Sequence, residues 1–242
     1  MAKDTLIYSR LIEIPETTGT QYYKTQITTD KNYSFLTGIL CMLRSGSVEG
    51  KDIEIEIRDD YKAIFSFSPA ANWLKAANNS GWDMTQIFRP CNIASKGKNI
   101  YINVKATDCE AFSFGVYLKQ THNNIKCIDY NFQSYDIESN SNNVIALPTN
   151  YKFIRGVQVS VPGNVTDTDY KLRVEDASGN LIDDIMCAAI NVHSYTHYDK
   201  SFMPVNFPGD ARDVKIYLTK MDDTTAATVK AKICFLVCNI SN

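Results

Sequence analysis

Residues 32–39 read Asn-Tyr-Ser-Phe-Leu-Thr-Gly-Ile, and residues 150–157 read Asn-Tyr-Lys-Phe-Ile-Arg-Gly-Val. The two stretches share Asn-Tyr-x-Phe-x-x-Gly, with Gly38 answered by Gly156 118 residues later. A second echo follows each of them, since residues 88–92 and 202–206 share Phe-x-Pro-x-Asn, with prolines at Pro90 and Pro204. Self-similarity of this kind indicates a repeated structural unit. The chain is therefore predicted to contain two equivalent halves.

Each half contains runs in which apolar and polar residues alternate, the pattern of a strand with one buried face. These runs fall at matching places, at residues 53–57, 100–104 and 112–118 in the first half and 170–174, 214–218 and 231–237 in the second. Clusters of turn-forming residues separate them. We predict an all-β chain of two tandem jelly-roll-like β-sandwich domains related by internal duplication, residues 1–120 and 121–242. An immunoglobulin sandwich is less favoured because its Cys…Trp…Cys spacing is absent.

Three segments carry more local expectations. Residues 5–14 are predicted to form the first strand, and the sequence leaves open whether this strand stays in its own sandwich or joins a neighbour. The alanine-rich residues 70–77 predict a helical turn, since alanine has the best helix propensity. The polar residues 133–143 are interpreted as a loop that matches the turn around Gly19 in the first half.

Composition excludes several classes of protein. The formal net charge is −2 over 242 residues, so the chain has no overall basic footprint for nucleic acid. No apolar run approaches the ~20 residues of a membrane span, and no signal-peptide pattern follows Met1. We therefore expect synthesis in the cytoplasm of the producing cell and no membrane partner. The seven cysteines contain no C-x-x-C pair, which favours reduced, buried thiols over a disulfide framework.

The sequence contains no motif that indicates a particular catalytic reaction. There is no G-x-S-x-G nucleophile elbow and no glycine-rich phosphate loop. His193 and His197 have a metal-like spacing, but on a strand they would lie ~13 Å apart, too far for one ion. Acidic pairs such as Asp183 and Asp184 are interpreted as solvated turn residues rather than calcium ligands. We expect no enzymatic activity, no cofactor and no metal.

Four aromatic residues flank equivalent loops and form the candidate functional site: Trp73, Trp82, Tyr195 and Tyr198. Exposed aromatic side chains anchor protein interfaces and stack on sugars. Three interpretations remain open: the four side chains plug the ends of the sandwiches, form a protein interface, or form two sugar platforms.

The repeat, the missing chemistry and the Asn/Thr/Tyr-rich composition together resemble a virion structural protein of a tailed, crAss-like bacteriophage, of the capsid, head-fibre or tail-accessory kind. The resemblance covers the whole chain and implies a homo-oligomer, or a double jelly-roll capsid protein that forms trimers, located in the virion and bound to other virion proteins. The alternative from another class is a tandem carbohydrate-binding module or adhesin, in which the four aromatic residues bind glycans.

Overall fold

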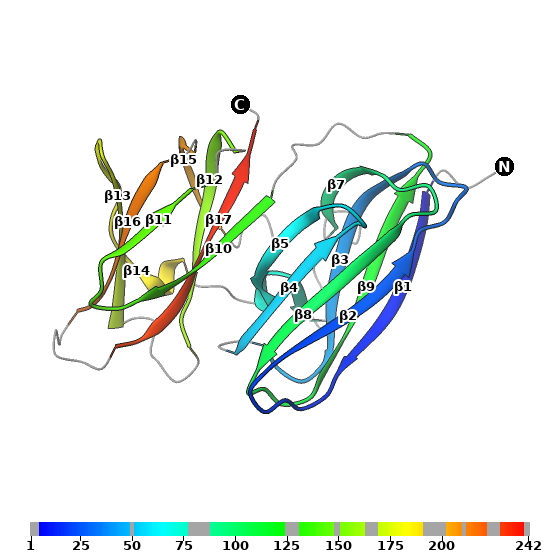
Figure 1. Cartoon of the computed structure of the whole chain (residues 1–242), viewed down its shortest axis with the longest axis horizontal. Helices are drawn as coiled ribbons and strands as arrows, with labels where there is room; N and C mark the ends of the chain where they lie inside the picture. The colour runs from blue at the N-terminus through cyan, green and yellow to red at the C-terminus, as the bar shows by residue number, and fades with distance from the viewer. Residues whose placement is uncertain are drawn as a thin grey trace. The chain divides into compact units, whose positions relative to one another are not determined.

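The computed structural model describes residues 5–48, 51–76, 88–123, 131–147, 151–162, 169–190, 202–209, 212–221 and 228–239. Within these residues the chain forms β-strands joined by turns, with two short 3-10 helices, η1 (Ala70–Asn72) and η3 (Cys187–Ala189). They divide into two compact units, unit 1 up to residue 123 and unit 2 from residue 131 onward (Figure 1). The boundary after residue 120 stays a prediction.

Unit 1 consists of two sheets. The first has the order β1 (Thr5–Ile14), β9 (Phe112–Thr121), β3 (Phe35–Ser45), with both β7 (Arg89–Ala94) and the short β6 (Leu74–Ala76) paired to β3. The second has the order β2 (Thr20–Thr28), β8 (Asn99–Thr107), β4 (Asp52–Arg58), β5 (Ala63–Pro69). All described pairings in this unit are antiparallel except the one between β3 and β6.

Unit 2 also consists of two sheets. The first has the order β10 (Asn131–Glu138), β17 (Lys230–Cys238), β12 (Phe153–Ser160), β15 (Met203–Pro208). The second has the order β11 (Asn143–Ala146), β16 (Asp213–Lys220), β13 (Tyr170–Asp176), β14 (Gly179–Met186). Every described pairing in unit 2 is antiparallel.

The two units have the same topology. When the short β6 is set aside and the strands of each unit are counted from one to eight, one sheet runs 1-8-3-6 and the other 2-7-4-5 in both units. This strand order, two interleaved four-stranded Greek-key sheets, defines a jelly roll. The chain is all-β with two tandem jelly rolls, so the predicted fold class is confirmed.

The sequence echoes lie at equivalent places in the two jelly rolls. Gly38 on β3 is the register partner of Pro90 on β7, and Gly156 on β12 is the partner of Pro204 on β15. A β-bulge precedes the glycine in both strands. Each glycine lies beneath the phenylalanine two residues before the proline, so the shared Gly and Phe-x-Pro motifs describe one packing arrangement that occurs twice.

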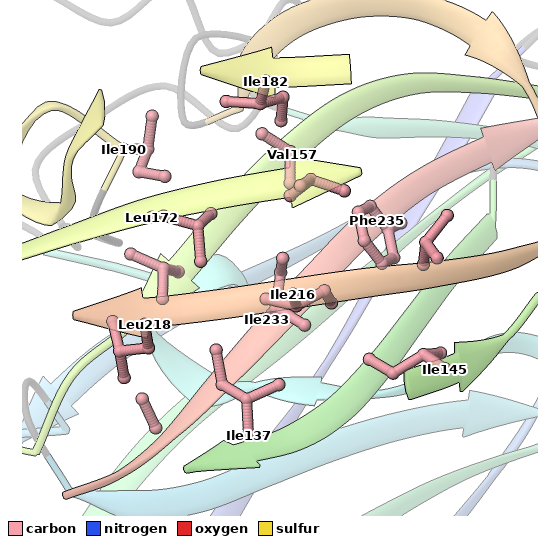
Figure 2. Close-up of a cluster of buried hydrophobic side chains, with 14 of the residues drawn as sticks. Ile137, Ile145, Val157, Leu172, Ile182, Ile190, Ile216, Leu218, Ile233 and Phe235 are labelled. Carbon is pink, nitrogen blue, oxygen red and sulfur yellow. The ribbon is translucent and has the colours of Figure 1, made fainter. Parts of the chain in front are cut away.

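Inward-facing side chains of the two sheets fill each sandwich. In unit 2 they come from strands of both sheets, including Val157, Leu172, Ile216 and Phe235, none of which is exposed (Figure 2). Alternation along the strands produces this arrangement, because residues two apart share a face. Side chains that point away from the core are not constrained by this packing, so they can differ between the two units.

Two local expectations need correction. The helical turn predicted for residues 70–77 is limited to η1, because Leu74–Ala76 pair with β3 as strand β6. The loop predicted for residues 133–143 is wrong over most of its length, since β10 extends to Glu138 and the turn covers only residues 139–142. An edge strand tolerates polar residues that a central strand would not, which is why composition was misleading. The first strand, β1, pairs with β9 of its own unit.

Candidate functional site

The outer face of the first sheet in unit 1 carries apolar side chains on three strands, together with Ser9 and Lys119. The register places Leu11 of β1 beside Gly115 of β9 and places Gly115 beside Met42 of β3. Residues two apart on a strand share a face. We call the surface formed in this way the outer apolar face; its members are Ile7, Leu11, Leu40, Met42, Phe88 and Tyr117.

The β3 end of the outer apolar face is a small packed cluster. Leu40 and Phe88 are buried, and Met42 and Tyr117 pack against them while remaining partly exposed. Phe88 reaches this position because Gly38 has no side chain: an added Cβ would lie 2.9 Å from the Cβ of Phe88. The apolar surface therefore continues from β3 toward the edge of the sheet.

The β1 end of the outer apolar face is open to solvent. Ile7 is 53% exposed and Leu11 is 40% exposed, and Tyr8, which points to the other face of the strand, is 41% exposed. β1 pairs with β9 on one side and lies at the edge of its sheet on the other (Figure 1). Large apolar residues gathered in this way mark interaction sites, whereas single exposed ones are ordinary.

Unit 2 carries polar residues at three of the equivalent positions. Ile7 of β1, Lys119 of β9 and Gly38 of β3 lie side by side in one row across the first sheet of unit 1. The equivalent row in unit 2 consists of Phe132 of β10, Leu236 of β17 and Gly156 of β12. Counting along the strands from these rows, Leu11 corresponds to an aspartate, Gly115 to a lysine and Leu40 to a glutamine, which are Asp136, Lys232 and Gln158.

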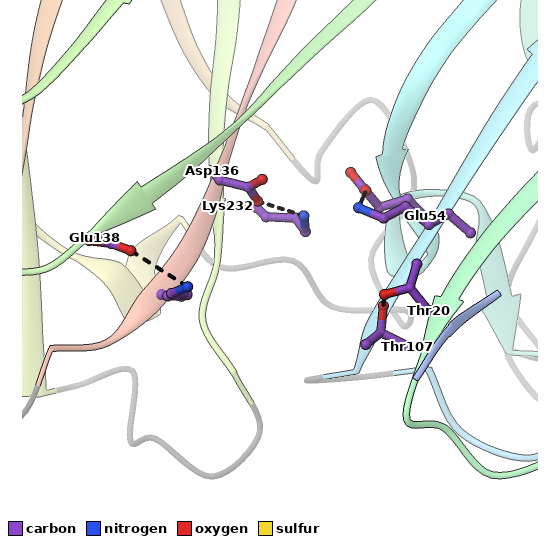
Figure 3. A network of polar contacts seen from close by, with 8 residues as sticks. Thr20, Glu54, Thr107, Asp136, Glu138 and Lys232 are labelled. Atoms are coloured by element: carbon purple, nitrogen blue, oxygen red, sulfur yellow. Dashed lines mark hydrogen bonds and ion pairs between the residues drawn. The ribbon is translucent and has the colours of Figure 1, made fainter. Parts of the chain in front are cut away.

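Two ion pairs lie on this side of unit 2. Lys232 Nζ lies 2.6 Å from the Asp136 carboxylate, and Lys230 Nζ lies 3.7 Å from that of Glu138 (Figure 3). Both pairs join β10 to β17. The two jelly rolls thus share a fold and differ in the side chains that their first sheets carry at these three positions.

One of the aromatic residues singled out from the sequence lies inside the fold. Trp73 is 3% exposed; its indole Nε1 donates to Ser68 Oγ at 2.9 Å, and the Arg89 guanidinium lies 4.4 Å from its ring centroid. Trp73 therefore offers no exposed sugar platform, and its place fits the interpretation as a plug. Trp82, Tyr195 and Tyr198 lie outside the described residues.

The titratable groups of the described residues show no sign of activation. Burial raises the pKa of the Cys41 thiol to about 12, which opposes formation of a thiolate, and the six described cysteines are all buried. The pKa of the Asp176 carboxyl is lowered, first by a hydrogen bond from the Ser178 hydroxyl, and that of Asp184 is lowered by a hydrogen bond from Lys171. General acids need the opposite shift.

Two searches of the described residues returned nothing. No group of three or more His, Cys, Asp or Glu side chains there could hold a metal ion. No helix in the described part of the chain is long and apolar enough to cross a membrane.

The outer apolar face was not identified from the sequence. A signal was present, because residues 6–8 and 11–12 are apolar on both faces of the predicted strand, whereas a strand with one wet face should alternate. The members on β9, β3 and the segment before β7 could not be found in this way, since only the register brings them beside β1.

Comparison with known proteins identifies no family. No family model matches the sequence, and no curated protein matches it. Similar solved structures include a protein of Sulfolobus turreted icosahedral virus (11% identity, TM-score 0.47, 96% of this chain and 90% of that one) and the major capsid protein of bacteriophage PM2 (10%, 0.45, 97% and 99%). Peptide:N-glycanase F is a further one (8%, 0.39, 99% and 98%). All three TM-scores are below 0.5, so the likeness carries no argument for function.

Proposed function

We propose that this protein is a non-enzymatic structural protein of a virion, a double jelly-roll protein that assembles with copies of itself. The observation that carries the proposal is the pairing of two jelly rolls of one topology in a single chain, one of which presents an outer apolar face. Fold alone does not set function, so the surface is the decisive part of the argument.

Two alike units in one chain suit the tiling of a shell. Three copies contribute six similar sandwiches, and six similar bodies around a three-fold axis give a near-hexagonal outline. The two edge strands then distinguish neighbours, because the exposed apolar residues of β1 and the ion pairs of β10 favour different partners. Most soluble homo-oligomers have closed symmetry of this kind.

The kind of virion is inferred from the sequence resemblance. On that basis the protein belongs to the virion of a tailed, crAss-like bacteriophage, as a capsid or tail component bound to other virion proteins. The tandem carbohydrate-binding alternative has lost one of its four platform residues, since Trp73 is buried.

The mass of the purified protein in solution tests the proposal. Light scattering over a range of concentrations should give a discrete oligomer, with a trimer as the expected species, and negative-stain microscopy should show closed particles of that mass. A monomer at every concentration would overturn the assembly role. A monomer whose tryptophan fluorescence responds to glycans would replace it with the carbohydrate-binding function.

A further inference from the structure

The described sheet edges differ in how well they are protected against pairing with another chain. Natural edge strands are blocked by charges, prolines or short length, because their free N–H and C=O groups are templates for another strand. β7 and β15 contain prolines, β11 spans four residues, and β10 carries acidic side chains paired with lysines. β2 has Lys24 at its centre, and β14 has Asp183 and Asp184. β5, the other edge of the second sheet in unit 1, spans seven residues and ends at Pro69.

β1 has no proline, and its only charged residues are Arg10 and Glu13. It runs for 10 residues without a proline, so every residue keeps its N–H, and Pro15 follows only where the strand ends. Its exposed side chains include Ile7, Tyr8 and Leu11. β1 is the longest of the described edge strands and carries exposed apolar side chains, which suits it to accept another strand.

The sequence of β1 is complementary to itself. When a two-fold axis perpendicular to the sheet relates two antiparallel copies of a strand, the residue numbers of every opposed pair add up to the same value. That value is even, because opposed residues point to the same face of the sheet. With the axis at Ser9, Ile7 faces Leu11 of the second copy on the outer side, and Tyr8 faces Arg10 on the inner side.

Each of these cross-strand contacts is favourable. Ile7 with Leu11 buries apolar surface that is exposed in the single chain. Tyr8 with Arg10 brings a guanidinium to the face of an aromatic ring, a favourable cation–π contact. Because the axis repeats every contact, each pair forms twice.

We propose that β1 is a docking edge for a second copy of this chain, and that two β1 strands pair antiparallel about a two-fold axis at Ser9. The pairing joins two five-stranded sheets into one continuous sheet and extends the outer apolar face across the axis. The inference rests on the proposed function: within a shell, the two-fold contact would link neighbouring oligomers whose own closure uses other surfaces.

A disulfide across the axis tests the register. Opposed residues of antiparallel strands have Cα atoms about 4.5–5.5 Å apart, within the range that a disulfide spans. Ser9→Cys in a Cys127→Ala background should therefore form a cross-linked dimer of the full chain under mild oxidation, since the remaining cysteines are buried. Non-reducing electrophoresis measures the yield.

Two further variants serve as matched controls. Glu13→Cys places its two thiols roughly 27 Å apart along the strands, so the yield should be roughly tenfold lower than for Ser9→Cys. Thr5→Cys mixed with Glu13→Cys should cross-link, because residues 5 and 13 oppose each other about this axis, while neither variant should do so alone.

The outcomes separate the two proposals. Cross-linking at Ser9, with the 5-to-13 pair and without Glu13 alone, supports the β1 contact. A wild-type oligomer in which Ser9→Cys yields no more cross-link than Glu13→Cys overturns the β1 contact and leaves the assembly role in place. A dimer linked at Ser9 that never builds larger particles keeps the contact and overturns the virion role.

Discussion

Glycine is required at positions 38 and 156 by a phenylalanine rather than by a turn. Neither residue has a positive φ, and both lie inside strands where glycine ordinarily costs stability. Phe88 and its counterpart Phe202 lie directly over them, at distances that leave no room for a Cβ. One residue choice thus allows an aromatic ring to lie against the outer side of each first sheet.

Gly38→Ala should destabilise unit 1 by about 1–3 kcal/mol, because the new methyl group would overlap the Phe88 side chain. Chemical denaturation of both proteins measures the difference in the free energy of unfolding. The double variant Gly38→Ala/Phe88→Ala removes the overlap, so its cost should be smaller than the sum of the two single costs. Additive costs would show that the glycine serves another purpose.

Asp176 links stability to acid pH. Hydrogen bonds from the Ser178 hydroxyl and backbone and from Arg212 hold its pKa below the usual 3.8. A carboxyl with a lowered folded-state pKa stabilises the protein above pH 3.8 and loses that contribution as the pH falls through the folded pKa. Wild-type protein should therefore lose free energy of unfolding in that acid range.

Asp176→Asn should be less stable than wild type at neutral pH and should show a smaller loss on acidification. Ser178→Ala should behave in the same direction, since it removes the donor that lowers the pKa most. Urea titrations at a series of pH values give both quantities. Parallel pH profiles for wild type and Asp176→Asn would contradict this role.

At the scale of the element, β1 and β10 show how one strand position takes two chemistries. Both are the first strand of their unit and both lie at a sheet edge beside the last strand. β10 has Asp136 where β1 has Leu11, and the carboxylate is paired with Lys232 of the neighbouring strand. An edge held by ion pairs resists pairing with other chains, whereas an apolar edge invites it.

Leu11→Asp should weaken self-association with little effect on stability, because the side chain is 40% exposed and surface changes usually cost less than about 0.5 kcal/mol. Sedimentation or light scattering should show the oligomer dissociating at a higher concentration than wild type. Val144→Asp is the matched control, since Val144 is 54% exposed on β11 of unit 2 and lies outside the outer apolar face. Equal effects of the two variants would remove the special role of β1.

At the scale of the whole molecule, each jelly roll has a core of its own. The core cluster around Phe235 contains only residues of unit 2, and Phe114 is fully buried within unit 1. Sandwiches of this length are large enough to support a separate core. The chain is best understood as two similar bodies whose surfaces have diverged.

Phe114→Ala should cost about 3–5 kcal/mol through the cavity that it leaves, and the loss should be confined to unit 1. Hydrogen exchange read by mass spectrometry should show faster exchange in strands such as β3 and β9 and unchanged protection in β12 and β17. Phe235→Ala should give the reverse pattern. Equal loss of protection in both units would show that they unfold as one.

The sequence by itself determined the fold class and its repetition. Period-two alternation fixes strands, and the paired Gly and Phe-x-Pro motifs mark the same register contact in both halves, because local geometry allows few other residues there. Composition failed for β10, since an edge strand and a loop can both be polar.

Only the tertiary structure decided which surfaces are available. Trp73 is the kind of aromatic residue that often binds ligands, yet in the fold it is buried. Its side chain packs against Ser68, five residues away, and against Arg89, which the fold brings close from strand β7. Conversely, Leu11, Tyr117 and Met42 share no pattern along the chain, and the antiparallel register alone places them on one face. Burial depends on contacts between strands far apart in sequence, which periodicity along one strand does not encode.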